Sequence, residues 1–140
     1  MGTQSIVYVS ADTLASWMDE RPKEKITILD VRDDDFVGGH IPGAIHFASK
    51  SFYENLPKVV EAVKDQKKVI VHCMQSAQRG PSCARVLREQ LPEATQVCVL
   101  RGGFSEWRRI FAEQPDRLAD NDSRCWASNG DYLGAIVTKQ

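Results

Sequence analysis

The 140-residue sequence contains no apolar run close to the roughly 20 residues that a membrane-spanning helix needs. Its first residues, 1–4, show no signal-peptide pattern. Basic and acidic side chains nearly balance, 18 against 19, so the net charge of −1 provides no general attraction for nucleic acid or an anionic membrane. We therefore expect a protein that binds neither, and that holds any anionic ligand at a local site.

Paired cysteine motifs are also missing. None of the four cysteines, at positions 73, 83, 98 and 125, has a Cys-x-x-Cys partner, and no histidine pair lies at ligand spacing. The sequence therefore predicts neither a metal site nor a disulfide framework, and it favours reduced thiols in the cytosol or nucleus. We interpret Cys83 and Cys98 as core residues and Cys125 as the most exposed thiol.

The composition, 42% hydrophobic and 26% charged, is typical of one globular domain with its own core. Stretches with apolar residues at helical spacing alternate with short buried strands, and Ser51–Glu54 has the Ser-x-x-Glu form of a capping box for one helix. This alternation predicts an α/β fold with a mostly parallel sheet covered by helices on both faces. The predicted strands are 6–9, 26–31, 44–47, 69–72 and 97–100.

The stretch Val69–Pro81 is typical of a buried strand that runs through a tight loop into a helix. Cys73 follows the strand at its carboxyl end, where open α/β sheets bind ligands. Five residues separate it from Arg79, enough for the backbone to curl around a tetrahedral anion. The predicted oxyanion site consists of the backbone N–H groups of Met74, Gln75, Ser76, Ala77, Gln78 and Arg79.

Charge and geometry at this loop favour a nucleophilic cysteine. The start of the following helix adds partial positive charge, which stabilises a Cys73 thiolate. The planar fork of Arg79 can hold two oxygens of the same anion. We interpret His72, which adjoins the nucleophile, as a structural hydrogen-bonding residue.

Several carboxylates follow the predicted strand 26–31. Asp30 at its end is interpreted as a structural partner of Arg32, in preference to a catalytic acid. We interpret the run Asp33–Asp35 as a solvated charged segment.

Three stretches together resemble a known family. His72–Arg79 resembles the His-Cys, five residues, Arg signature shared by the cell-division-cycle dual-specificity phosphatases of the rhodanese fold and the eukaryotic arsenate reductases built on the same domain. Leu29–Arg32 with Gly38–Ile45 resembles the first rhodanese motif, and Val99–Trp107 resembles the closing Gly-Gly-Phe-x-x-Trp motif. The resemblance spans most of residues 7–112 and is greatest to small single-domain members. It implies a rhodanese-like catalytic domain over 1–114, with a tail, 115–140, of unassigned structure.

The resemblance implies that the Cys73 thiolate attacks a tetrahedral oxyanion held by the loop amides and Arg79. The expected function is a cysteine-dependent phosphatase that hydrolyses phosphotyrosine or mixed protein phosphomonoesters through a thiol-phosphate, without a resident cofactor. The alternative is an arsenate reductase that uses glutathione and glutaredoxin as reductants. The larger cell-cycle phosphatases carry carboxylates where this loop has Met74 and Gln78, so the loop offers no leaving-group acid. Thiosulfate sulfur transfer is less favoured because those loops are one residue shorter.

Cys83 has two interpretations. We interpret this residue as part of the helix face that packs on the sheet, pointing away from the loop mouth. The alternative is a thiol that protects an oxidised Cys73 by forming a disulfide with it.

Overall fold

The computed structural model describes residues 5–20 and 25–134, and its centre is one parallel sheet. The strand order is β1-β5-β4-β2-β3, and every neighbouring pair is parallel. This confirms the predicted sheet. The strands are β1 (Val7–Val9), β2 (Ile26–Asp30), β3 (Ile45–His46), β4 (Lys68–His72) and β5 (Gln96–Leu100).

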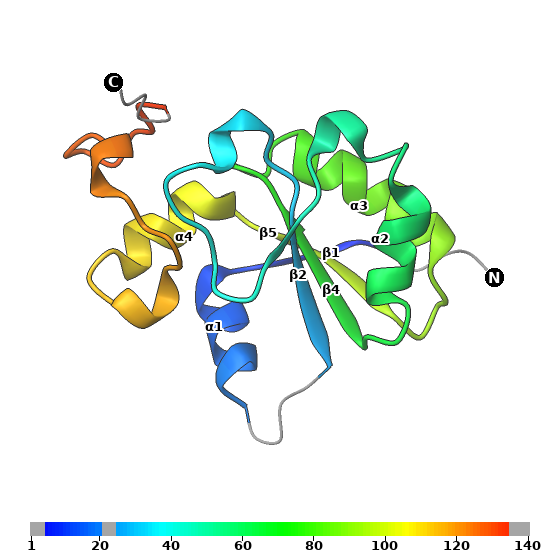
Figure 1. Cartoon of the computed structure of the whole chain (residues 1–140). Coiled ribbons are helices and arrows are strands. Elements are labelled where there is room, and N and C mark those ends of the chain that lie inside the picture. The colour runs from blue at the N-terminus through cyan, green and yellow to red at the C-terminus, as the bar shows by residue number, and fades with distance from the viewer. Residues whose placement is uncertain (1–4, 21–24, 135–140) are drawn as a thin grey trace.

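Helices cover both faces of the sheet, as predicted. Figure 1 shows α1 (Ala11–Asp19) and α4 (Gly103–Phe111) on one side, and α2 (Leu56–Val63) and α3 (Arg79–Gln90) on the other. Each side buries its own apolar cluster, with Trp107 in the first and Leu87 in the second. Because β4 is central, the loop that follows it opens between these layers at the carboxyl edge of the sheet.

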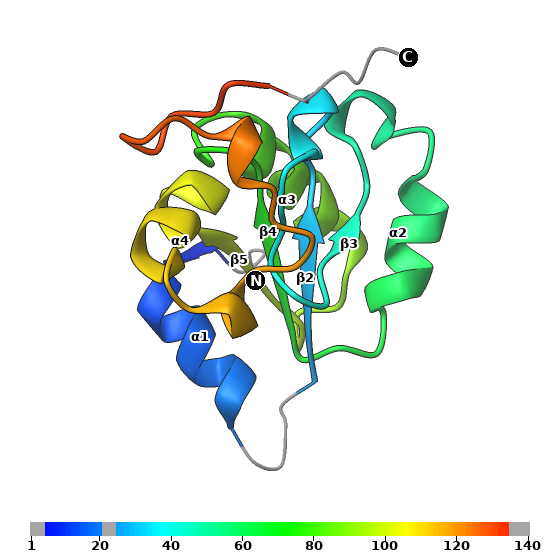
Figure 2. The same ribbon diagram turned by 60° about the vertical axis from the view of Figure 1, so that its left-hand side comes forward.

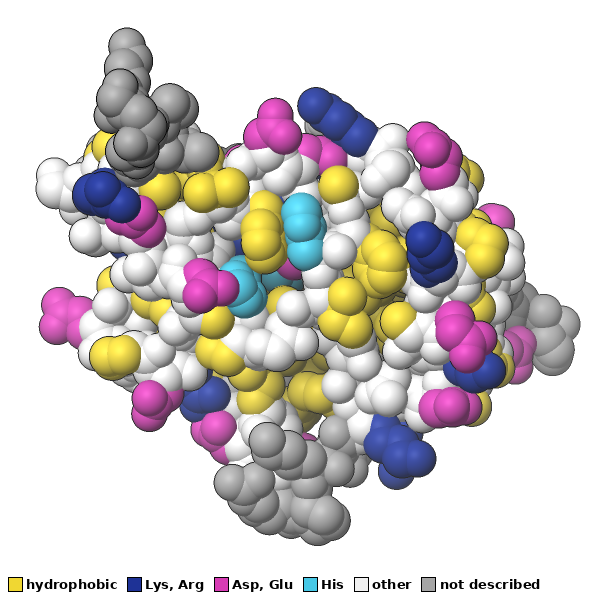
Figure 3. Space-filling model, viewed as in Figure 1, with side chains coloured by type: hydrophobic (Ala, Val, Ile, Leu, Met, Phe, Trp, Pro, Cys, Tyr) yellow, Lys and Arg dark blue, Asp and Glu magenta, His cyan; other side chains and the backbone are white. Residues whose placement is uncertain are grey.

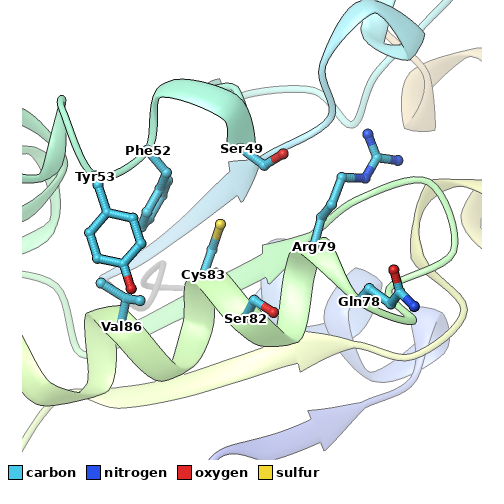
Figure 4. Close-up of a pocket in the computed structure, with 8 residues that line it drawn as sticks. All are labelled: Ser49, Phe52, Tyr53, Gln78, Arg79, Ser82, Cys83 and Val86. Atoms are coloured by element: carbon cyan, nitrogen blue, oxygen red, sulfur yellow. The ribbon is translucent and has the colours of Figure 1, made fainter.

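The starts of α1 and α2 differ in how they are capped. The Ser10 hydroxyl accepts a hydrogen bond from the Thr13 N–H at 3.1 Å, so it caps α1. The predicted capping box at Ser51 is wrong, because Ser51 ends a short 3-10 turn, Ser49–Ser51, and α2 starts after Asn55. The extra turn moves the start of the helix and places residues 49–53 opposite α3 (Figure 4).

The segment after α4 packs on the first glycine-rich motif. Its backbone pairs with His40 through Ala119, and the Trp126 indole N–H donates to the Gly38 carbonyl at 3.1 Å. The segment also contains two short 3-10 turns, Pro115–Arg117 and Ser123–Cys125. In Figure 2 this orange stretch lies beside α4 and crosses toward the cyan stretch. The prediction that Cys125 is an exposed thiol is wrong, because its side chain is fully buried under this contact.

The surface carries charges of both signs. Figure 3 shows them scattered over one face, with histidine side chains beside apolar ones near its middle. The Phe36 ring stacks on His46 with ring centroids 4.0 Å apart and on His40 at 5.1 Å. No helix within 5–20 or 25–134 combines the length and apolar character needed to cross a membrane.

Candidate functional site

The loop between β4 and α3 curls around the sulfur of Cys73. The Ser76 N–H donates to Cys73 Sγ at 3.2 Å, and the Gly80 N–H donates to the same sulfur at 3.3 Å. Only 3% of the Cys73 surface is exposed, so the sulfur lies at the floor of a cup. Inward-pointing N–H groups at the start of a helix are the arrangement that stabilises a thiolate and binds an anion.

Two features hold the loop in this shape. Ser76 adopts a left-handed backbone with φ of 55°, a conformation that is uncommon outside glycine. Its hydroxyl accepts a 3.4 Å hydrogen bond from the Cys73 N–H. A strained residue of this kind persists only where its surroundings enforce it, and such residues cluster at functional sites.

The second feature is the start of α4. The N–H of Phe104 donates to the Cys73 carbonyl at 3.0 Å, and the N–H of Ser105 donates to the Met74 carbonyl at 2.8 Å. These contacts hold the loop carbonyls against α4. Gly103 permits the approach, because a Cβ there would lie 2.5 Å from the Cys73 carbonyl oxygen. The closing Gly-Gly-Phe motif therefore supports the loop directly.

Beneath the cup lies a fully buried charged group. Arg32 donates to the Asp30 carboxylate, with a shortest distance of 2.7 Å, and also to the Gly39 carbonyl at 2.8 Å. The pairing of Asp30 with Arg32 is as predicted. Burial would raise the pKa of Asp30, but the hydrogen bonds and charge of Arg32 outweigh it, so the pKa lies below its usual value.

His72 is wedged between this group and the loop. Its Nδ1 lies 3.0 Å from the Cys73 carbonyl oxygen, which can only accept, so Nδ1 carries the proton. Its Nε2 lies 3.7 Å from the Asp30 carboxylate and makes no hydrogen bond within the described residues. Complete burial lowers the pKa of His72, although Asp30 opposes the shift. The geometry agrees with a structural hydrogen-bonding residue.

Arg79 closes one side of the cup, but its guanidinium is paired with acidic side chains. It donates to Asp35 at 2.7 and 3.0 Å and to Asp33 at 3.2 Å. The interpretation of Asp33–Asp35 as a solvated run is therefore wrong for two of its members, and only Asp34 is exposed. The residues follow β2 directly, and β2 pairs with β4, so their side chains reach the same sheet edge as the loop.

The ion pairs shift the titration of all three groups. Burial would raise the pKa of Asp35, but the hydrogen bonds and charge of Arg79 hold it below its usual value. Burial would also raise the pKa of Asp33, but it lies below its usual value. The causes are hydrogen bonds from the Ser49 hydroxyl and the Lys50 N–H, followed by those from Arg79. The hydrogen bonds that Arg79 donates to Asp35 are the main cause that raises the pKa of Arg79. Arg79 thus stays charged and is restrained at the rim of the cup.

A hollow of about 480 Å³ opens above the sulfur. It brings together the cysteine, most of the predicted loop and one carboxylate that the sequence reasoning missed. Its walls are formed by Asp35, Cys73, Met74, Gln75, Ala77, Gln78 and Arg79. Within the described residues no cluster of three His, Cys, Asp or Glu side chains could hold a metal ion. The arrangement of a sulfur nucleophile, inward amides and a guanidinium suits nucleophilic attack on a bound tetrahedral oxyanion.

Comparison with known proteins matches this geometry. The sequence profile of the rhodanese-like domain matches residues 10–110. The chain is 35% identical over 130 residues to dual specificity phosphatase ibp1 of Schizosaccharomyces pombe, covering 79% of this chain and 94% of that protein. It is 37% identical over 111 residues to arsenate reductase 2.1 of Oryza sativa subsp. japonica, covering 74% of this chain and 68% of that one. A solved yeast protein tyrosine phosphatase of the rhodanese family superposes with a TM-score of 0.76 at 30% identity, covering 90% of this chain and all of that chain.

Proposed function

The chain belongs to the rhodanese-like domain family, and from that premise we propose that it is a cysteine-dependent phosphatase acting on phosphotyrosine or mixed protein phosphomonoesters. The observation that carries the proposal is the pair of N–H groups, from Ser76 and Gly80, aimed at the Cys73 sulfur. Relatives named as phosphatases support the same activity.

In the proposed reaction the Cys73 thiolate attacks phosphorus from the side opposite the ester oxygen. The S–P bond forms as the P–O bond breaks, and the departing oxygen takes a proton from solvent. A water molecule then attacks the thiol-phosphate, the S–P bond breaks, and inorganic phosphate leaves with the thiolate restored. Loop amides from 74–79 stabilise the equatorial oxygens in both steps.

Arg79 has to change partners for this reaction. When phosphate binds, its oxygens replace the carboxylate oxygens of Asp33 and Asp35 as acceptors for the Arg79 guanidinium. The planar guanidinium can donate two parallel hydrogen bonds to a phosphate or to a carboxylate. The ion pair is partly exposed, because 33% of the Arg79 side chain contacts solvent, so its free energy is small enough for a dianion to displace it. We infer that the carboxylates hold Arg79 ready while the cup is free of substrate.

Turnover of para-nitrophenyl phosphate tests the nucleophile. Cys73→Ser is expected to abolish turnover, and acid quenching of the native enzyme is expected to trap one phosphoryl group, seen by intact mass and mapped to Cys73. Cys125→Ser, which alters a buried thiol away from the loop, is the matched control and keeps its activity. Turnover that survives Cys73→Ser would exclude the covalent mechanism.

The same assay tests the guanidinium. Arg79→Lys keeps the positive charge but loses the planar guanidinium that donates two parallel hydrogen bonds. We expect the rate of para-nitrophenyl phosphate hydrolysis to fall by about 10²–10³-fold. Arg85→Lys changes an exposed arginine on the same helix and is the control. Equal turnover in the two variants would mean that Arg79 does not grip the oxyanion.

Arsenate reduction is the second candidate, and a relative at 37% identity named as an arsenate reductase supports it. Cys73 would form a thiol-arsenate, and two electrons from further thiols, such as glutathione with glutaredoxin, would reduce As(V) to As(III). Met74 and Gln78 leave the loop without acidic side chains, which suits a substrate that needs no leaving-group acid. Arsenate-dependent glutathione oxidation, measured beside aryl phosphate hydrolysis, distinguishes the two activities.

We also place the protein in a reducing compartment, the cytosol or nucleus. All four cysteines are free thiols, which supports this proposal.

A further inference from the structure

A second hollow, of about 330 Å³, lies between α3 and the turn over residues 49–53. Figure 4 shows the side chains around it: Tyr53 and Val86 stand at one end, and Arg79 and Gln78 at the other. Its remaining lining residues are Ser49, Phe52, Ser82 and Cys83. Neither the proposed chemistry nor the sequence motifs assign it a role.

The second hollow is adjacent to the cup. Gln78 and Arg79 line both hollows, so the two share these side chains as a common boundary. Along α3, Cys83 lies one turn beyond Arg79, about 6 Å, and Val86 lies about 10 Å beyond it. These spans match the distance between a phosphorylated residue and a side chain one or two residues away in an extended peptide.

The lining of the second hollow is mainly apolar. Phe52 and Val86 form walls, and Tyr53, which is 74% exposed, stands at the solvent side. Figure 4 shows the Cys83 sulfur pointing into the same space. Cys83 packs in the same buried cluster as Leu87 and does not line the hollow above Cys73, which agrees with the interpretation of a core residue that faces away from the loop mouth. Burial, and then the charge of Cys73, raise the pKa of Cys83 to about 12, so this wall is a neutral thiol at physiological pH. An uncharged, apolar group is the chemistry that suits these walls.

The direction of attack decides which part of a substrate reaches this hollow. The leaving oxygen must lie opposite Cys73 Sγ, so the ester group points out of the cup. The second hollow lies along α3, beyond Arg79, and Cys73 does not line it. The phosphorylated side chain therefore occupies the cup, and a different side chain of the same substrate occupies the second hollow. Its volume is at the lower end of the roughly 300–1,000 Å³ of whole-ligand sites, which suits one side chain.

We propose that the second hollow is a specificity subsite that takes one apolar side chain near the phosphorylated residue of a peptide substrate. The proposal rests on the phosphatase function and narrows its substrate class to phosphopeptides with a large aliphatic or aromatic neighbour. Free arsenate or phosphate fills only the cup and makes no use of this surface.

The test compares phosphotyrosine peptides in an otherwise serine-rich host. Leucine replaces serine singly at each position from two before to two after the phosphotyrosine, and kcat/KM is measured for each peptide. At least one leucine peptide is expected to exceed the all-serine peptide by about tenfold. The ratio of the two peptides is the readout, because a general loss of activity cancels from it.

Two variants probe the hollow from opposite sides. Tyr53→Ala removes the exposed aromatic side chain from the lining of the second hollow. Ser82→Trp places a large side chain in the second hollow from an exposed position on α3. Both are expected to bring the leucine-to-serine ratio close to one. Glu54→Ala and Glu89→Trp make similar changes at exposed positions outside the lining, and they keep the tenfold ratio.

The outcomes separate this inference from the phosphatase function. Phosphopeptides that are all turned over equally, or a leucine preference that survives both hollow variants, would overturn the subsite and leave the phosphatase intact. An absence of turnover on every phosphopeptide and on para-nitrophenyl phosphate would instead refute the phosphatase function, and the subsite with it.

Discussion

At the level of single residues, the pairing of Arg79 with Asp33 and Asp35 is the feature that most affects how the cup binds an anion. Two carboxylates beside an oxyanion site repel the ligand and also hold the guanidinium that attracts it. Asp35 lines the cup itself, whereas Asp33 is also held by Ser49 and Lys50. Of the two carboxylates, Asp35 is therefore the one whose removal should release Arg79 while leaving the contacts of Asp33 with Ser49 and Lys50 in place.

Asp35→Asn is expected to tighten binding of inorganic phosphate, measured as competitive inhibition of aryl phosphate hydrolysis, by roughly two- to fivefold, the range for a partly exposed ion pair. Asp34→Asn removes the same charge from an exposed neighbour outside these contacts and should change the inhibition constant little. Equal effects in the two variants would attribute the change to net charge and not to the release of Arg79.

His72 should make stability depend on pH. Its pKa is lowered by burial, so below the unfolded value of about 6.5 the unfolded chain binds a proton that the folded chain does not. The free energy of unfolding should therefore fall as pH drops from about 6.5 through the lowered folded pKa, by up to about 1.4 kcal/mol per pH unit. Urea unfolding from pH 7.5 to 5.5 measures this slope, and His72→Gln should reduce it. An unchanged slope in the variant would show that other groups cause it.

At the level of secondary-structure elements, the start of α4 supports the loop that holds Cys73. Its first N–H groups hold the carbonyls of Cys73 and Met74, and this leaves the following amides of the loop free to face the sulfur. The arrangement depends on Gly103, which has a φ of 59° and lies too close to the loop backbone for any side chain.

Gly103→Ala should both destabilise the fold and distort the cup. A Cβ would lie 2.5 Å from the Cys73 carbonyl oxygen and 2.6 Å from that of Met74, and the left-handed backbone adds its own penalty. Gly43→Ala isolates that penalty, because Gly43 has a φ of 83° with nothing within 4 Å. Urea unfolding should show a loss of about 1–2 kcal/mol for Gly43→Ala and at least about 2 kcal/mol more for Gly103→Ala. Equal losses would mean that the loop yields to the methyl group.

At the level of the whole molecule, residues 115–134 hold the first glycine-rich motif in place. Trp126 packs against Phe104 and donates to the Gly38 carbonyl, and the Tyr132 hydroxyl donates to the Val37 carbonyl at 2.6 Å. A Cβ at Gly38 would meet Cys125 at 2.9 Å, so the two segments fit closely. Because Asp33 and Asp35 precede this motif, the segment also supports the carboxylates that hold Arg79.

Trp126→Ala is expected to lower the free energy of unfolding by about 3–5 kcal/mol, the range for removing a buried aromatic side chain. Leu133→Ala, at a position that is 65% exposed in the same segment, should change it by less than about 0.5 kcal/mol. Denaturant unfolding checks both variants. A small loss at Trp126 would show that the segment is attached only loosely to the domain.

Local sequence was sufficient for most of the elements and for the loop between β4 and α3, but not for the start of α2. Buried strands such as 26–30 and 68–72 are visible as short apolar runs, and the spacing of Cys73 and Arg79 lies within a single loop. The Ser10 cap and the parallel sheet follow from equally local signals. These properties depend on neighbours along the chain, which a sequence displays directly.

Contacts between distant segments were not visible in this way. The partners of Arg79 lie 44 and 46 residues earlier, Cys125 is buried by the first glycine-rich motif, and the hollow beside Cys83 forms only where residues 49–53 meet α3. Each of these features depends on the fold, which places particular turns and the ends of particular strands side by side at one edge of the sheet. Folding decided these features, because the free energy of burying and pairing side chains depends on neighbours in space and not on their order in the chain.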